Sequence, residues 1–406
     1  MEATIQKGFR FLMEPVVLQK LGFLKTFGCD RKLYNHYVDT LYTYLDSIGY
    51  ENGCIDLKQV PLESPKEVKE SYPYMKEVDS LALCNAQIHF KRAVAKFNKE
   101  QDKISYTKRS LKRKRTLGIA PTFRDLKGMP RFKSKKNNDF SYTTNNQSHG
   151  GKWSDITLED GWLKLPKVKE RIKVKQHRPL PEGCIIKNAT ISMDYRGKFY
   201  VSLCVEYKIN IQQVPAQKVL GLDYSQTDFY VDSEGGKANY PHYYRKAEAK
   251  LAKEQRKLSR REIGSSNWQR QKRVVQKLQA KTANQRTDWL HKESRKLADA
   301  YDAVMVEDLD LRALGQCLKL AKNQQDNGFG MFRNFLKYKL EEAGKQFIKI
   351  DKFYPSSKTC HVCGHVYSAL TLKERAWICP ECGTNHDRDH NAAINIKEAG
   401  TALLAW

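Results

Sequence analysis

Four cysteines near the end of the chain place the strongest constraint on what it can fold into. They form two Cys-x₂-Cys pairs, Cys360 with Cys363 and Cys379 with Cys382, separated by fifteen residues. This spacing lets two tight turns present four thiolates to one tetrahedral Zn²⁺. Because four thiolates leave the metal no open position, we predict a structural zinc ribbon whose metal contributes folding energy.

A redox dithiol is the alternative interpretation, but it requires only one such pair. Gly364 and Gly383 each follow the second cysteine of a pair, which suits turns whose amides point toward sulfur. Three nearby histidines are available as substitute ligands, although four cysteines make them unnecessary: His361, His365 and His386.

The charge of the chain indicates a polyanionic partner. Its 406 residues include 72 Lys and Arg against 46 Asp and Glu, a net charge of +26. Such an excess repels itself in a compact state unless a polyanion neutralises it, so we expect nucleic acid rather than charge for solubility alone. Any single basic run has the alternative of a solvated face. The clustered cations that we predict to contact phosphates are Lys108, Arg109, Lys112, Arg113, Lys114, Arg115, Arg131, Lys133, Lys135 and Lys136.

Cysteine usage and hydropathy predict the compartment. Ten cysteines in a chain of this length do not make a disulfide scaffold, which indicates a reducing environment. The apolar patches of residues 9–27 are interrupted by charged residues, well short of a membrane span or a signal sequence. We therefore expect a soluble, cytoplasmic protein.

Hydrophobic patterning divides the chain into three regions. From about residue 14 to 112 apolar residues recur at helical spacing, for example at Ile88, Phe90 and Val94, which predicts an antiparallel helical lobe. From about 130 to 219, short β-branched and aromatic runs predict a small β-barrel or sandwich, with a hairpin turn at Arg196 and Gly197. The strands expected there are 162–165, 183–189, 190–195 and 198–207.

From residue 218 onward the predicted strands and helices alternate, which is typical of an α/β domain. Two long basic helices stand out, joined by a short turn at residues 264–266. The predicted strands are 219–224, 229–231, 303–306 and 347–350, and the predicted helices are 245–262, 267–298 and 332–342.

Three acidic residues lie where such a domain places its ligand sites. Asp223 and Glu307 each end an apolar run that we predict to be a buried strand, and Asp389 precedes a helix-like segment. Hydrolysis of a phosphodiester by two Mg²⁺ needs several carboxylates that converge on ions about 4 Å apart. Because ligand sites of α/β folds lie at strand ends, we predict that these three acids bind two catalytic Mg²⁺.

Each acid taken alone has an ordinary structural explanation. Asp223 would be a turn residue, Glu307 a surface acid and Asp389 the N-cap of the last helix. Their joint occurrence in a basic chain with a zinc ribbon favours the active-site interpretation. Five neighbouring acids are the competitors, of which the last is the hardest to exclude: Asp228, Asp232, Asp308, Asp310 and Asp387.

Several segments resemble one known family. Residues 353–360, 379–383 and 386–396 run from the cysteine pattern into the motif around Asp389, and 284–292 and 304–309 are further motifs. At these residues the chain is similar to the TnpB family, transposon-associated relatives of type V CRISPR effectors. The resemblance covers nearly the whole chain and is weaker at 31–35 and 163–166. Within the helix motif it implies nucleic-acid contacts for Arg286, His291 and Lys292.

The resemblance implies an α+β multidomain fold. A wedge-type β-barrel, interrupted by a helical recognition lobe, would precede an RNase H-like (RuvC) α/β domain with an inserted zinc ribbon. The expected boundaries are 1–13 and 116–217 for the barrel, 14–115 for the lobe, 218–354 and 387–406 for the RuvC-like domain, and 355–386 for the ribbon.

The activity implied is RNA-guided, Mg²⁺-dependent cleavage of double-stranded DNA beside a short motif, with a guide RNA from the transposon end and Asp223, Glu307 and Asp389 as metal ligands. A frequent family form has Leu-Gly after the first aspartate, where this chain has Tyr224 and Ser225. Two alternatives remain open. One is a nuclease-dead, RNA-guided DNA-binding regulator, and the other is a guide-free, structure-selective nuclease.

Overall fold

The computed structural model describes residues 2–100, 105–135, 140–149, 153–309, 326–371 and 374–404. The chain divides into two compact units, Thr4–Ile209 and a second unit of Met1–Ala3 with Asn210–Trp406. Each unit has its own hydrophobic core. Within the described ranges, no helix combines the length and the apolar character that crossing a membrane requires.

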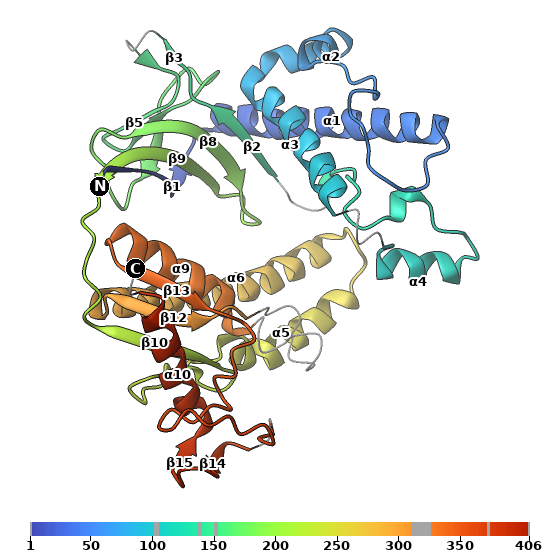
Figure 1. Cartoon of the computed structure of the whole chain (residues 1–406). Helices are drawn as coiled ribbons and strands as arrows, with labels where there is room; N and C mark the ends of the chain where they lie inside the picture. The colour runs from blue at the N-terminus through green and yellow to red at the C-terminus, as the bar shows by residue number, and fades with distance from the viewer. Residues whose placement is uncertain are drawn as a thin grey trace. The chain divides into compact units, whose positions relative to one another are not determined.

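A curled seven-stranded sheet forms one part of the first unit (Figure 1). Its order is β2-β8-β9-β1-β7-β6-β5. Strand β1, from the start of the chain, therefore lies between β9 and β7, which come from much later positions in the sequence. Buried and more exposed residues alternate along much of β1 and β9, so one face of the sheet packs on the core. The strands are β1 (Glu2–Glu14), β2 (Phe140–Asn145), β5 (Thr157–Glu159), β6 (Trp162–Lys164), β7 (Ile172–Lys175), β8 (Ile185–Met193) and β9 (Phe199–Asn210), beside a separate pair, β3 (Ser148–His149) and β4 (Trp153–Ser154).

The predicted hairpin turn is confirmed between β8 and β9. Met193 pairs with Phe199, and Gly197 takes the positive φ of 77° that the turn requires. The prediction of two strands over 183–195 is wrong, because β8 pairs with β9 as one strand from Ile185 to Met193. A register shift between Ile186 and Asn188 absorbs the irregularity within one strand.

Helices form the rest of the first unit, as predicted. Helices α1 and α3 pack against each other around the buried side chains of Tyr37 and Phe90. The buried face of α3 continues through Val94 and Phe97, whereas Ile88 is exposed, so the pattern predicted the helix but misplaced part of its face. The helices are α1 (Val17–Ser47), α2 (Pro65–Ser71), η1 (Pro73–Glu77), α3 (Ser80–Lys99), α4 (Lys108–Thr116) and η3 (Phe123–Asp125).

The second unit is built on a four-stranded sheet of order β11-β10-β12-β13. Strand β10 is antiparallel to β11 and parallel to β12, which is parallel to β13. The strands and helices of this unit are β10 (Val219–Ser225), β11 (Phe229–Asp232), α5 (Tyr243–Ser259), α6 (Ser266–Ala300), β12 (Ala303–Glu307), α9 (Phe329–Glu342), β13 (Gln346–Ile350), β14 (Ala376–Ile378), β15 (Asn385–Asp387) and α10 (Arg388–Ala402). The four strands of the sheet and helices α5, α6 and α9 agree with the predicted ones to within a few residues, whereas β14 and β15 were not predicted.

Two glycines let α10 lie directly against this sheet. A Cβ atom added to Gly221 would lie 2.2 Å from the carbonyl oxygen of Ala393, and one added to Gly400 would lie 2.0 Å from Cγ of Met305. Gly221 and Met305 are partners in the parallel register of β10 and β12, so both contacts lie on one face of the sheet. The helix therefore covers this face at a distance that larger side chains would not permit.

Gly221→Ala is expected to destabilise the second unit by about 3 kcal/mol, because the added methyl group meets backbone that cannot rotate away. Hydrogen–deuterium exchange of β10 and α10 in increasing urea measures this unit by itself. Gly28→Ala is the matched control, since a Cβ there, within helix α1, has nothing within 4 Å. It should gain roughly 1 kcal/mol from helix propensity. Equal protection in both variants would contradict the close packing of α10.

Candidate active site and metal centre

Asp223 and Glu307 lie side by side at the ends of parallel strands. Leu222 of β10 is the partner of Val306 of β12, and the two acids are the next residues of their strands. Adjacent strands are about 4.8 Å apart, and alternate residues share a face. Both carboxylates therefore belong to the face that carries Gly221, which α10 covers.

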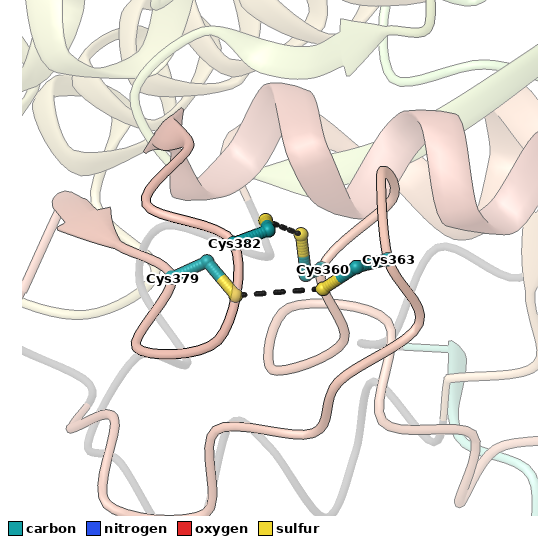
Figure 2. A group of neighbouring side chains, drawn as sticks. All are labelled: Cys360, Cys363, Cys379 and Cys382. Carbon is teal, nitrogen blue, oxygen red and sulfur yellow. Dashed lines mark hydrogen bonds between the residues drawn. The ribbon is translucent and has the colours of Figure 1, made fainter.

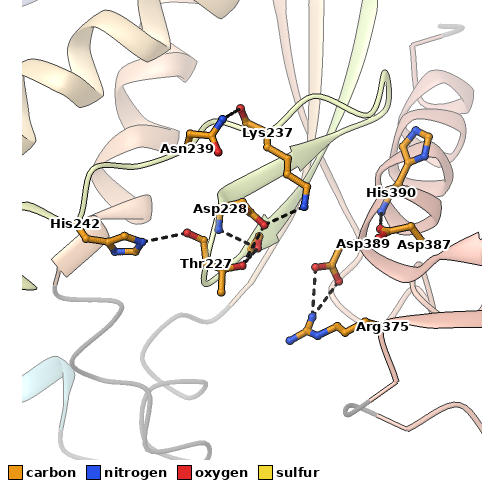
Figure 3. Close-up of polar contacts among 10 residues, drawn as sticks. Thr227, Asp228, Lys237, Asn239, His242, Arg375, Asp387, Asp389 and His390 are labelled. Atoms are coloured by element: carbon orange, nitrogen blue, oxygen red, sulfur yellow. Dashed lines mark hydrogen bonds and ion pairs between the residues drawn. The ribbon is translucent and has the colours of Figure 1, made fainter.

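Asp389 lies in the first turn of α10, at the same end of the sheet. Ala393, one turn further along the helix, is the residue whose carbonyl group approaches Gly221. The N-cap of the helix is Asp387, which accepts a hydrogen bond from the backbone N–H of His390 at 2.9 Å (Figure 3). The capping role is thus filled by the competitor, and the Asp389 carboxylate is left for other contacts.

Burial and the two other acids disfavour the charged form of Asp223. Its side chain is buried, and burial raises its pKa well above the usual range; the charges of Glu307 and Asp389 raise it further, while Arg388 opposes them. Burial likewise raises the pKa of Glu307, against a hydrogen bond from the Ser356 hydroxyl group. Gathered carboxylates of this kind are stabilised in their ionised form by a cation.

The spacing of the three carboxylates limits what they can hold. Among the residues that the structure describes, only the four cysteines gather three or more metal-ligating side chains within 4.8 Å, so the acids lie further apart. Two ions about 4 Å apart, each about 2 Å from its ligands, separate carboxylates on opposite sides by up to about 8 Å. The three acids are therefore less tightly gathered than the four thiols, as carboxylates that hold an ion pair would be.

Three of the competing acids are engaged elsewhere. Asp228 accepts hydrogen bonds from Thr227 and Lys237 (Figure 3). Asp232 accepts hydrogen bonds from the backbone N–H groups of its own turn. Asp308 is exposed and pairs with Lys349 at 2.8 Å. Asp310 lies outside the described residues.

Two contacts to the acids come from the ribbon and were missed in the sequence. The Arg375 guanidinium lies 3.3 Å from each oxygen of Asp389 (Figure 3), and the Ser356 hydroxyl donates to Glu307. The pairs are separated by 14 and 49 residues in the chain. No spacing rule for such pairs exists, and only the family-like stretch around residue 356 drew attention to one of them.

The four predicted cysteines come together as expected (Figure 2). The Sγ atoms of Cys360 and Cys382 lie 3.6 Å apart, as do those of Cys363 and Cys379. A tetrahedral Zn²⁺ with bonds of about 2.3 Å has sulfur atoms about 3.8 Å apart. The four thiols therefore fit one structural Zn²⁺.

The nearby histidines are not members of the four-thiol cluster but contact residues around it. Nε2 of the buried His386 lies 3.1 Å from the sulfur of Cys360, and the ring of His361 contacts the side chain of Asn391 at 2.9 Å. The backbone carbonyl of His365 accepts from the N–H of Cys360. Such outer contacts orient metal ligands.

The predicted phosphate contacts differ in how available they are. Lys114 pairs with Asp125 at 2.8 Å, and Lys133 lies 3.3 Å from the buried Asp30. These two ammonium groups already have anionic partners. Lys112, Arg115, Arg131 and Lys135 are exposed, Lys136 lies outside the described residues, and no side chain is described for Lys108, Arg109 or Arg113.

The motif on α6 faces a neighbouring helix in part. The His291 ring stacks on Phe335 of α9 with centroids 3.9 Å apart, and Arg286 is half-buried beside Gly328. Lys292 is exposed and pairs with Asp288 at 2.7 Å. Nucleic-acid contact by these three residues stays a prediction.

Two family models match this part of the chain. One, described as "Probable transposase", matches residues 202–317, which include Asp223 and Glu307. The other, described as "Cas12f1-like, TNB domain", matches residues 329–396, which include Asp389 and the four cysteines.

Relatives match over greater lengths. A protein of Streptomyces pristinaespiralis, whose name describes it as an RNA-guided DNA endonuclease, is 32% identical over 411 residues, covering 100% of this chain and 92% of that protein. InsQ of Escherichia coli (strain K12), named in the same way, is 30% identical over 299 residues, covering 70% of this chain and 71% of its own. A cryo-EM structure of a Cas12f1-sgRNA-target DNA complex has 14% identity and a TM-score of 0.49, covering 93% of this chain and 83% of that one.

Proposed function

Because the chain belongs to the TnpB family, whose members are named as RNA-guided DNA endonucleases, we propose that it cleaves double-stranded DNA at sites selected by a bound guide RNA. The guide would come from the end of a transposable element, and the protein would read a short motif beside the target. Base pairing with the guide would read the rest.

The observation that carries the proposal is the convergence of the acids. Asp223 and Glu307 are neighbours in the parallel register, and Asp389 begins the helix packed on the same face. Burial and the two other carboxylates all disfavour the charge of Asp223. Such a cluster of like charges costs stability and is typical of a functional site, which supports a site for cations.

We propose that these three acids hold two Mg²⁺, since carboxylate oxygens are the ligands that Mg²⁺ prefers. The ions would supply an activated water and stabilise charge on the leaving oxygen. The protein positions the carboxylates on two strands and one helix, which are rigid elements. Asp223 is buried, and surroundings of low polarity strengthen the electrostatic attraction between a carboxylate and a cation.

We assign a structural role to the ribbon and a nucleic-acid role to the basic surfaces. The ribbon, 355–386, would bind one Zn²⁺ through its four cysteines. We assign 218–354 and 387–406 to an RNase H-like (RuvC) nuclease domain, 14–115 to a recognition lobe, and 1–13 with 116–217 to a wedge domain. The exposed cations would hold RNA and DNA by their backbones, so that affinity falls steeply with salt.

Copurified RNA tests the guide. We expect the protein, expressed together with its native flanking DNA and purified in low salt, to retain one discrete RNA that directs cleavage of matching DNA in Mg²⁺. Sequencing of that RNA, followed by a cleavage assay on matched and mismatched targets, makes the measurement. An absorbance ratio at 260 and 280 nm typical of pure protein, with cleavage that ignores target sequence, would instead favour a guide-free nuclease.

A further inference from the structure

Residues 356–359, just before the turn that carries Cys360 and Cys363, lie between the two proposed metal sites in the chain's contacts. Ser356 is 3% exposed, and its hydroxyl donates to an oxygen of Glu307. Four residues later the same segment reaches Cys360, a member of the four-thiol group. This segment therefore connects the cysteine cluster with one acid of the proposed active site.

Two asparagines of α10 hold the segment by its backbone. Asn391 and Asn395 are one helical turn apart and are 2% and 1% exposed. The Nδ2 of Asn395 donates to the carbonyl of Ser356 at 2.8 Å and to that of Thr359 at 2.6 Å. The Nδ2 of Asn391 donates to the same two carbonyls at 3.4 and 2.7 Å. Buried amides with several partners fix a position precisely, because losing one partner leaves another group unsatisfied.

The turn that carries Cys360 and Cys363 also contacts Asn391. The backbone N–H of His361, which follows Cys360, donates to Oδ1 of Asn391 at 3.1 Å, and Nδ1 of its ring lies 2.9 Å from the same oxygen. The side-chain oxygen of Asn391 is thus engaged by the turn, and its nitrogen by the segment before the turn. The helix that carries Asp389 is thereby attached to the cysteine cluster.

We infer that Ser356 is a positioning residue for Glu307, and that the thiol-bearing turn and the two asparagines set its place. This inference rests on the proposed function. A serine whose backbone is fixed has only a few staggered rotamers open to its hydroxyl, and donation to one carboxylate oxygen leaves further lone pairs for a cation. The ribbon would then assemble the acidic site as well as stabilise its own fold.

The Ser356→Ala variant tests the inference through metal binding as well as cleavage. Loss of an outer hydrogen bond to a metal ligand typically costs 10- to 100-fold in affinity or activity. We expect Mn²⁺ binding by the RNA-loaded protein, measured from the electron paramagnetic resonance signal of free Mn²⁺, to weaken about tenfold, with a similar loss of single-turnover cleavage. Target DNA affinity and zinc content should stay at wild-type values.

Ser357→Ala is the matched control, because its hydroxyl makes no hydrogen bond to another described residue. Ser356→Thr, which keeps the hydroxyl, should retain most Mn²⁺ affinity. Asn395→Leu, which keeps the branched shape of the side chain but loses both donated bonds, should weaken Mn²⁺ binding several-fold and keeps the inference testable if Ser356→Ala does not fold. Wild-type Mn²⁺ affinity in Ser356→Ala or in Asn395→Leu overturns the inference, as does a loss of zinc or DNA binding that matches the loss of Mn²⁺.

The Mn²⁺ measurement needs no substrate, so the two proposals fail separately. A wild-type protein that binds Mn²⁺ but does not cut guide-matched DNA refutes the proposed function. A wild-type protein that cuts, beside a Ser356→Ala variant that cuts and binds Mn²⁺ equally well, refutes only the positioning role.

Discussion

Asp223→Ala is expected to abolish DNA cleavage while guide RNA and target binding persist. Asp223 is the most deeply buried of the three acids and the one on which the charges of the other two act. Loss of metal-based stabilisation worth about 4 kcal/mol corresponds to a rate reduction of about 1,000-fold. Single-turnover cleavage of a guide-matched duplex, with target binding measured by filter retention, makes the comparison.

Asp228→Ala is the control for this prediction, because Asp228 lies in the turn after the same strand yet is engaged by Thr227 and Lys237. It should cleave within a few-fold of the wild type. The neutral variant Asp223→Asn should also lose cleavage, although the metal-free protein should become more stable, since a buried carboxylate repelled by two others is removed. Retained cleavage in either Asp223 variant would remove this acid from the mechanism.

The double variant Cys379→Ser, Cys382→Ser is expected to lose bound zinc, unfold the ribbon and eliminate cleavage. Structural Zn²⁺ binds with about 10–16 kcal/mol, as much as the whole stability of a typical domain. The ribbon otherwise has only a small core around Leu370 and Trp377. Zinc per chain, measured by mass spectrometry of the metal, should fall from about one to near zero, and limited proteolysis should cut within the ribbon.

Cys54→Ser is the matched control, because Cys54 is exposed and belongs to the other unit. It should keep its zinc and its cleavage activity. Zinc retained by the double variant would show that two thiols with His386 or His361 suffice. A protease-resistant ribbon without zinc would show that the metal does not contribute to its folding.

The sequence alone determined the local features of this protein. Sequence patterns predicted the four strands of the second unit's sheet and helices α5, α6 and α9 to within a few residues, because buried strands and amphipathic helices impose recognisable patterns. The cysteine spacing predicted the four-thiol cluster, since both pairs lie in tight turns close together in the chain. Placement at predicted strand ends and before a helix, together with the family resemblance, selected Asp223, Glu307 and Asp389 from eight candidate acids.

Only the tertiary structure decided the contacts between distant segments. It assigned the N-cap to Asp387, gave Asp228, Asp232 and Asp308 other partners, and joined β1 to strands formed much later. The contacts of Ser356 and of the two asparagines could not be read from the sequence, although all three residues lie in family-like motifs. Hydrogen bonds across 35 or 49 residues depend on how the ribbon packs on α10 and β12, and the packing of α10 on the sheet depends on the absence of side chains at Gly221 and Gly400. The hydrophobic pattern of a segment indicates which of its faces is buried, but it does not indicate which other segment packs against that face.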